Sequence, residues 1–338
     1  MVPALAVADA LLAEGADVTF IGGGRAEAQL VPAANLPLYT ISVEGLSRSN
    51  PLRALRALAL ALAAVMRARS LLGTLAPDAV MGGGGYVAGP VALAALTRRV
   101  PIVLTEADSH LGLTNRMLAP FARRVCLAFP IAGRDGERYR VTGRPVAQSS
   151  QDRTAARRRL GIGEHETCVL VFGGSLGARS INLAAVEGLS GGPFRVLHVC
   201  GRRDHAGLAG RELPASYDLR EYLELRDFAD ALAAADLVVA RAGGSVFEIA
   251  ASGVPAILVP YPHASGDHQA ANARWMSQAG AAVTIPDGEL TAARLRAEVA
   301  ALLGDRERLA EMAAAARGLA RPDAAQEVAG ELLESARR

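Results

Sequence analysis

A glycine-rich cluster, GGSLGAR at 173–179, directly follows an apolar run that ends at Phe172. Glycines let a backbone approach a phosphate closely, and the helix predicted over Ser180–Leu189 would offer free N–H groups and the positive end of its dipole. Ser175 adds a hydroxyl group to this turn. The cluster therefore predicts a phosphate-binding loop, and a plain glycine-rich turn is the alternative interpretation of so short a motif.

A second cluster, RAGGSVFEIAASGVP at 241–255, repeats this arrangement after another apolar run. Gly243, Gly244 and Ser245 would open a helix, and Glu248 would lie one turn into it. A carboxylate at this place suits a ribose diol, which offers two hydroxyl donors. The alternative is that Glu248 caps its own helix, as in a capping box.

A third cluster, PYPHASGDHQAANA at 260–273, is dense in amide and imidazole groups, which suit the recognition of sugar hydroxyls. A zinc site is the alternative, because two histidines and an aspartate lie close together. The spacing of the histidines does not place them on one helical face, as i and i+4 would, and this disfavours zinc. The polar side chains of the cluster are His263, Asp267, His268, Gln269 and Asn272.

Two further clusters lie in the first half of the chain. TEADSHLGLTNR at 105–116 carries Glu106, Asp108 and His110, each of which could accept a proton. The alternative for this segment is a polar loop with a helix N-cap. GGGGYVAGP at 82–90 would let a backbone or a ligand pass close by, and a tight turn before a buried helix explains it equally well.

Short apolar runs alternate with longer helical patterns, which predicts an α/β protein with doubly wound sheets. The runs are nearly continuous, as expected of parallel strands covered on both faces. Ligands of open parallel sheets bind outside the carboxyl ends of the strands, which is where the polar clusters lie. The predicted strands are Val18–Ile21, Ala79–Met81, Ile102–Leu104, Val125–Leu127, Cys168–Phe172, Val196–Val199, Leu237–Ala240 and Ala256–Val259.

The polar, aperiodic stretch Val141–Thr154 predicts the joint between two domains. We expect one domain over 1–146, a second over 150–322, and a C-terminal helix over 323–338 that packs back toward the first domain. The first domain opens with a predicted helix, Val2–Glu14, although a doubly wound domain should open with a central strand. We therefore hypothesise that translation starts upstream of Met1, which an in-frame stop codon just before it would contradict.

Bulk composition excludes several classes of protein. The chain has 338 residues, enough for two domains, and a net charge of +2, which argues against a protein built mainly to bind nucleic acid. Its three cysteines lie in apolar runs and are predicted to be buried, reduced thiols. No export signal is recognisable, and the longest apolar stretch, Ala57–Met66, is about half the length that crosses a bilayer. We expect a protein that is soluble or lies on a membrane surface.

The segment Pro51–Thr74 predicts an amphipathic helix. One face carries apolar residues, and a second face mixes arginines with leucine, a combination that suits the surface of an anionic membrane. A core-packed helix with a solvated charged side is the alternative. The residues expected to contact the membrane are Arg53, Arg56, Leu60 and Arg67.

Taken together, these clusters resemble the MurG family of bacterial cell-wall synthesis. The likeness covers nearly the whole chain and includes GGGGYVAGP, HLGLTNRMLA, VFGGSLGARSIN, ADLVVARAGG and PAILVPYPHASGDHQAANA, in this order. The resemblance implies the GT-B fold, with two doubly wound, Rossmann-like domains facing a cleft. It also implies an inverting transfer of N-acetylglucosamine from UDP-N-acetylglucosamine to the 4-hydroxyl of undecaprenyl-diphosphate-linked muramyl-pentapeptide, which converts lipid I to lipid II without a metal or other cofactor.

The resemblance also implies roles for single residues. Asp108 and Glu106 are the candidates for the catalytic base, with Asp108 also close to substrate. The residues implied on the donor side are Ser175, Leu225 beside the uracil, Gly243, Gly244 and Ser245 near the diphosphate, Glu248 at the ribose and Gln269 at the sugar. The residues implied on the acceptor side are Gly83, Gly84, Tyr86 and Asn115. The family works on the cytoplasmic face of the cell membrane as a peripheral protein, in peptidoglycan synthesis, and so in cell shape and division.

Three features depart from the family pattern. The opening strand and a loop like GGTGGH are missing, Asp108 stands where relatives often have asparagine, and Ala147 replaces a common arginine. Two alternatives to the lipid II-forming enzyme follow: a GT-B transferase with another lipid acceptor, and a non-catalytic protein that binds a nucleotide sugar. A turnover assay with donor and acceptor separates the last of these from an enzyme.

Overall fold

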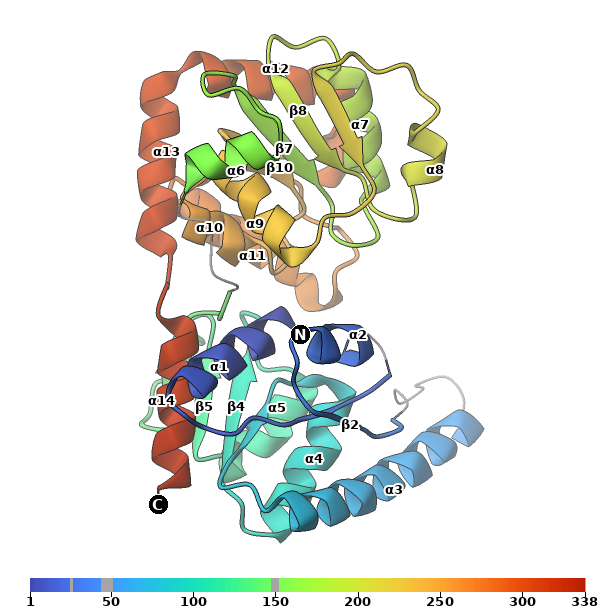
Figure 1. Ribbon diagram of the computed structural model, residues 1–338, viewed down its shortest axis with the longest axis vertical. Helices are drawn as coiled ribbons and strands as arrows, with labels where there is room; N and C mark the ends of the chain where they lie inside the picture. Colours follow the sequence, from blue (N-terminus) through green and yellow to red (C-terminus); the bar gives the residue numbers. More distant parts are fainter. Residues whose placement is uncertain (25–26, 44–50, 147–151, 338) are drawn as a thin grey trace. The chain divides into compact units, whose positions relative to one another are not determined.

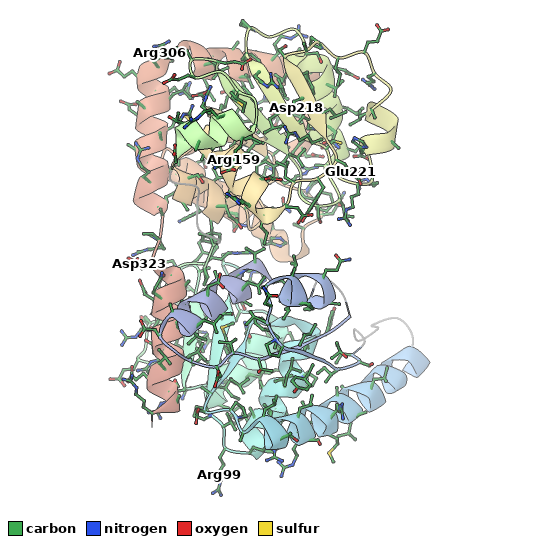
Figure 2. All side chains as sticks on the ribbon, viewed as in Figure 1. Arg99, Arg159, Asp218, Glu221, Arg306 and Asp323 are labelled. Atoms are coloured by element: carbon green, nitrogen blue, oxygen red, sulfur yellow. The ribbon has the colours of Figure 1, made fainter. Side chains whose placement is uncertain are left out.

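A computed structural model describes residues 1–24, 27–43, 51–146 and 152–337, apart from the side chains of 51–59 and 265. The chain separates into two compact units. The first unit combines Met1–Val146 with Arg321–Arg338, and the second is Ala147–Ala320. In both units the side chains fill the space between sheet and helices (Figure 2).

The second unit contains a six-stranded parallel sheet in the order β12-β11-β10-β7-β8-β9 (Figure 1). The chain builds one half of this sheet outward from β7 and then returns to build the other half outward from β10. The strands are β7 (Cys168–Phe172), β8 (Arg195–Val199), β9 (Tyr217–Arg220), β10 (Leu237–Ala240), β11 (Ala256–Leu258) and β12 (Ala282–Thr284).

Helices cover both faces of this sheet, which explains why its central strands are apolar throughout. Val169 and Val171 of β7 point into the core cluster formed with α7 and α12. Phe172 points to the opposite face, where its ring meets Phe228 of α9 edge-on at 5.0 Å. The helices of this unit are α6 (Arg153–Arg159), α7 (Arg179–Leu189), α8 (His205–Leu208), α9 (Leu225–Ala234), α10 (Val246–Ser252), α11 (His268–Gln278), α12 (Ala292–Gly304) and α13 (Arg306–Leu319), with 3-10 turns η2 (Ser265–Asp267) and η3 (Asp287–Glu289).

The first unit contains two parallel sheets. One has the order β3-β4-β5-β6 and the other pairs β1 with β2, and among the described residues no backbone pairing joins the two. The strands are β1 (Phe20–Gly22), β2 (Leu38–Thr40), β3 (Val80–Gly82), β4 (Ile102–Glu106), β5 (Arg124–Leu127) and β6 (Tyr139–Val141). The helices are α1 (Val2–Ala13), α2 (Glu27–Ala33), α3 (Pro51–Leu75), α4 (Gly85–Thr97), α5 (Leu113–Leu118) and α14 (Ala324–Ala336), with the 3-10 turn η1 (Ala119–Phe121).

The C-terminal helix α14 belongs to the first unit, where it lies beside α1 (Figure 1). Val328 and Leu332 of α14 share a buried cluster with Val7 of α1 and Val103 of β4. Outside this cluster, Glu331 of α14 accepts a hydrogen bond of 2.8 Å from the Arg124 guanidinium. Apolar burial and the ion pairs of Glu331 with Arg124 and Arg140 thus hold the end of the chain on the first unit.

The cysteines are buried free thiols, and burial raises the pKa of both Cys126 and Cys168 to about 12. They are therefore protonated and unreactive at neutral pH. Within the described residues, every helix is too short or too polar to cross a membrane.

Candidate functional site

The segment 173–178, here called the β7 loop, turns the chain from β7 into α7. Gly174 and Gly177 adopt left-handed backbone angles, with φ of +92° and +81°. A Cβ atom at Gly177 would overlap the carbonyl oxygen of Cys200, so the loop packs directly on the neighbouring backbone. Ser175 is exposed at the tip of the turn, and its carbonyl accepts a hydrogen bond from the Arg202 N–H at 3.4 Å. Glycine is therefore required for the shape that presents Ser175 to solvent.

The segment 241–245, here called the β10 loop, makes the equivalent turn from β10 into α10. Ser245 is the N-cap residue of α10, yet its side chain makes no capping hydrogen bond with any described residue. Asn272 holds the loop from inside the unit, since its Nδ2 donates to the carbonyls of Ala242 at 3.0 Å and Gly243 at 3.4 Å. The Asn272 side chain is 2% exposed and its amide nitrogen is bound to backbone, so it holds the loop, and its part in sugar recognition stays a prediction.

An arginine that the sequence motif contains, but to which we assigned no role, joins several strand ends. Arg241 donates to Asp287 Oδ1 at 2.6 Å and to the carbonyls of Val259 and Pro260 at 3.1 and 3.2 Å. Its other terminal nitrogen donates to Ser180 Oγ at 2.9 Å, and that hydroxyl donates to Asp287 at 2.6 Å. The ends of β10 and β11, the residues after β12 and the start of α7 are thus tied together. The hydrogen-bonded partners lie up to 107 residues apart in the sequence, so no local spacing could have revealed them.

Gln269, the predicted sugar ligand, has a defined orientation at the start of α11. Its Oε1 accepts a hydrogen bond of 2.9 Å from the backbone N–H of Tyr261, which leaves Nε2 as the outward donor. A Cβ at Gly243 would lie 4.0 Å from Nε2, so the amide group faces the β10 loop. The Tyr261 ring also lies 5.4 Å from the Arg241 guanidinium.

These loops occupy the place in the sheet where a ligand is expected. β7 and β10 are hydrogen-bonded neighbours, and the chain leaves them in opposite directions across the sheet. Such a switch point opens a crevice at the carboxyl ends of the strands. The structure brings Gly243 and Gln269 together and puts Glu248, half-buried, one turn into α10. Leu225 begins α9 and is 36% exposed.

In the first unit, Glu106 organises the loop after β4. Its Oε2 accepts hydrogen bonds from the Gly112 N–H at 2.8 Å and from Asn115 Nδ2 at 2.9 Å, while its Oε1 accepts from the Asp108 N–H at 3.2 Å. Glu106 is only 7% exposed. Its carboxylate is therefore used to shape the loop, whereas Asp108 lies half-buried on that loop.

The glycine-rich turn after β3 meets this loop. A Cβ at Gly84 would lie 3.5 Å from Asn115 Nδ2, and one at Gly83 would lie 3.7 Å from Thr105 Oγ1. Asn115 is buried, and the same nitrogen donates to the Thr105 carbonyl at 2.9 Å. Tyr86 follows the turn and is 62% exposed. The structure thus brings Gly83, Gly84 and Asn115 together and leaves Tyr86 at the surface beside them.

Comparison with known proteins identifies the family. The model of the glycosyltransferase family 28 N-terminal domain matches residues 1–127, and that of the C-terminal domain matches residues 168–328. An enzyme of Alkalilimnicola ehrlichii, a UDP-N-acetylglucosamine–N-acetylmuramyl-(pentapeptide) pyrophosphoryl-undecaprenol N-acetylglucosamine transferase, is 44% identical over 99% of this chain and 95% of its own. The chain belongs to the MurG family of glycosyltransferases.

Other members of the MurG family agree with this assignment, and a more distant structure shares the fold. The transferase of the same name from Aeromonas hydrophila is 41% identical over 97% of this chain and 92% of its own. The crystal structure of Acinetobacter baumannii MurG superposes with a TM-score of 0.76 at 31% identity, covering 98% of this chain and 95% of that one. The glycotransferase of kitacinnamycin, at 20% identity, has a TM-score of 0.70 over 98% of this chain and 95% of its own. The predicted GT-B fold, with two doubly wound domains, is thereby confirmed.

The β7 loop of this MurG family member can be tested without any ligand. We expect Gly177→Ala to lower the free energy of unfolding of the second unit by about 3 kcal/mol, because a left-handed backbone costs an alanine about 1–2 kcal/mol and overpacking adds about 1–3 kcal/mol. Gly174→Ala is the matched control, since φ is +92° there but no described atom lies within 4 Å of an added Cβ. Urea unfolding of both variants makes the comparison, and equal losses would contradict the packing argument.

Proposed function

We propose that this chain transfers N-acetylglucosamine from UDP-N-acetylglucosamine to the 4-hydroxyl of lipid-linked N-acetylmuramyl-pentapeptide, converting lipid I to lipid II in peptidoglycan synthesis. The observation that carries the proposal is the pair of glycine loops at the switch point of a GT-B domain. The names of relatives that match along almost their full length supply the donor and the acceptor. The match to both domain models of glycosyltransferase family 28 agrees with a transferase that binds a donor and an acceptor.

The second unit would bind the donor. Glycine N–H groups of the β7 and β10 loops, with the hydroxyls of Ser175 and Ser245, would approach the diphosphate. The Glu248 carboxylate would accept hydrogen bonds from the ribose diol, and Leu225 would border the uracil. Gln269 would donate from Nε2 to a sugar hydroxyl, in keeping with the bond that already occupies its Oε1.

The first unit would bind the acceptor, and Asp108 would serve as the base. The acceptor hydroxyl would displace UDP directly from the anomeric carbon, which inverts the configuration, while loop N–H groups stabilise the leaving diphosphate. Three donors already bind the Glu106 carboxylate, so protonation of Glu106 would disrupt the hydrogen bonds that shape the loop. Asp108 is the better base because only its backbone N–H takes part in these bonds.

Glu248→Ala is expected to weaken UDP binding by roughly 1–3 kcal/mol, because two ribose hydroxyls would lose their acceptor. Glu311→Ala is the control, as it removes an exposed carboxylate from α13. Titration calorimetry with UDP compares the two variants with the parent chain. Equal affinity of all three proteins would refute the ribose assignment of Glu248.

Turnover of UDP-N-acetylglucosamine and lipid I tests the activity and the base together. Relatives often have asparagine at this position, so Asp108→Asn tests whether this chain has a base that those relatives lack. We expect kcat to fall by roughly 10²–10⁴-fold, the usual contribution of a general base, with UDP affinity unchanged. Asparagine keeps the size of the side chain and one acceptor oxygen but cannot take up a proton as a base, so a retained kcat would remove Asp108 as the base. A parent chain that binds UDP-sugar without any turnover would instead indicate the non-catalytic binding protein.

Membrane contact is proposed for α3, on the cytoplasmic face of the cell membrane. Ala64, Ala68 and Leu71 form the buried side of this helix, whereas Leu62 and Met66 are 66% and 62% exposed. Arg67 is exposed and Leu60 is half-buried, while the side chains of Arg53 and Arg56 lie outside the described residues.

Charge favours an anionic membrane surface next to these residues. Residues 51–77 contain four arginines and no acidic residue, and residues 109–134 also lack acidic residues. Each basic residue near an anionic membrane contributes about 1 kcal/mol. Within the second segment Leu113, Met117 and Phe121 are 55–66% exposed, so α5 and η1 offer further apolar contacts.

Replacing both Leu62 and Met66 by serine is expected to weaken binding to vesicles of phosphatidylglycerol and phosphatidylcholine by roughly tenfold or more, since burial of such a side chain is worth about 1.5–3 kcal/mol. Leu12→Ser is the control, because Leu12 is 45% exposed on α1. Vesicle sedimentation gives the partition coefficients. If the double variant and the control bind alike, α3 does not contact the membrane through these residues.

A further inference from the structure

A network of buried polar side chains runs beneath the β7 loop. It consists of Tyr217, His198 and Asn182 and is here called the His198 network. The proposed chemistry makes no use of it. His198, on β8, is fully buried, and both of its ring nitrogens have partners. Nδ1 lies 2.8 Å from the Tyr217 hydroxyl, and Nε2 lies 3.0 Å from Asn182 Oδ1. Tyr217 and Asn182 are 6% and 1% exposed. Buried polar groups cost free energy unless they are hydrogen-bonded, so we expect this network to have a role.

The hydrogen bonds of the His198 network can have only one set of donors and acceptors. Asn182 Nδ2 faces the Cys200 carbonyl and the Asp204 carboxylate, both at 2.8 Å and both acceptors, which fixes the amide orientation. Asn182 Oδ1 must then accept, so the imidazole hydrogen is on Nε2. Nδ1 is left to accept from the Tyr217 hydroxyl. Burial lowers the pKa of His198 to about 4, which keeps the ring neutral as this arrangement requires.

At its Asn182 end, the His198 network reaches the backbone on which the β7 loop rests. Asn182 holds the carbonyl of Cys200, and a Cβ at Gly177 would overlap that same oxygen. A Cβ at Gly201 would overlap the Gly177 backbone, so the two segments are in direct contact. Asp204 is itself held by Arg203 at 3.0 Å, and this hydrogen bond lowers the pKa of Asp204. The shape of the β7 loop therefore depends on where Asn182 holds residues 200–204.

We propose that His198 and Tyr217 are positioning residues for nucleotide-sugar binding: they fix the amide of Asn182, which sets the backbone at Cys200 against which the β7 loop takes its ligand-binding shape. The inference rests on the proposed binding of a UDP-sugar at this loop. Neither side chain touches the ligand. Both act through Asn182, so their loss changes affinity for the donor and leaves chemical groups of the reaction in place.

Tyr217→Phe is the sharpest test, because it removes one hydroxyl and keeps the aromatic ring. Without that donor, Nδ1 is unsatisfied as an acceptor, and a hydrogen moved onto Nδ1 would take the Nε2 hydrogen away from Asn182. We expect UDP to bind about tenfold more weakly, KM for the donor to rise, and KM for the lipid acceptor to stay the same. Hydrogen exchange of residues 173–178 should become faster.

Two further variants separate positioning from general stability. His198→Gln keeps a donor toward Asn182 and should recover part of the UDP affinity that His198→Leu loses. Tyr139→Phe is the matched control: its hydroxyl accepts a hydrogen bond of 3.1 Å from Arg134 in the first unit, and its loss should leave UDP affinity unchanged. In ¹⁵N spectra of the parent protein, His198 should show a protonated Nε2 and an unprotonated Nδ1.

The outcomes distinguish this inference from the proposed function. If the parent chain fails to bind UDP, the proposed donor site fails, and the positioning roles fail with it. If the parent chain binds UDP and Tyr217→Phe keeps the same affinity and the same exchange in residues 173–178, only the positioning roles are overturned. The positioning roles are also overturned if Tyr217→Phe lowers Tm without changing UDP affinity, since the His198 network would then only stabilise the fold.

Discussion

Close packing of backbone against backbone at the ends of β7 and β8 is the constraint on which the candidate donor site depends. Gly177 lies against the Cys200 carbonyl with no room for a side chain, and Gly201 lies equally close to Gly177. This contact lets the β7 loop turn sharply, and Ser175 at its tip is exposed. A loop that filled the same space with side chains would cover the N–H groups that a phosphate needs.

The first unit solves a similar problem with a charge in place of glycine packing. The loop after β4 has few apolar side chains with which to hold its shape, and Glu106 supplies the missing contacts by accepting three hydrogen bonds. Bonds to a carboxylate are stronger than bonds between neutral groups, so one buried side chain can order residues up to Asn115. The glycine turn before α4 lies against Thr105, Thr114 and Asn115.

Among the described strands, sequence patterns predicted every interior strand of the sheets and missed four of the six outermost strands. All eight predicted strands are present within two residues of their expected bounds, because strands covered on both faces are continuous apolar runs. The four strands without a prediction, β2, β6, β9 and β12, are each the outermost strand of a sheet. Their sequences, such as YRV and YDLR, mix polar and apolar residues because one side is solvated. These four strands therefore lack the signal on which the prediction relied, whereas the outermost strands β1 and β3 carry it.

Candidate site residues were predictable where a motif is local and not where partners are distant in sequence. Gly243 and Gln269 belong to recognisable clusters, and their proximity follows from the meeting of strand ends at one edge. Roles within a cluster were harder to assign: Asn272 faces inward to the backbone, and Glu106 organises a loop. Whether a polar side chain points to ligand or to backbone depends on helix rotation and burial, which a list of residue types does not contain.

The arginine at the β10 loop shows why residue type alone is also insufficient. Arg241 serves a carboxylate, two strand-end carbonyls and a hydroxyl at once, which a planar guanidinium with five donors can do and a lysine cannot. Its charge is balanced by Asp287 at 2.6 Å, and its side chain is 11% exposed. An arginine beside the proposed diphosphate site suggests a phosphate ligand, yet a paired and enclosed guanidinium has its donors directed into the fold. Arg241 therefore supports the loop, and in the proposed donor complex the negative charge of the nucleotide would be met by N–H groups of the glycine loops.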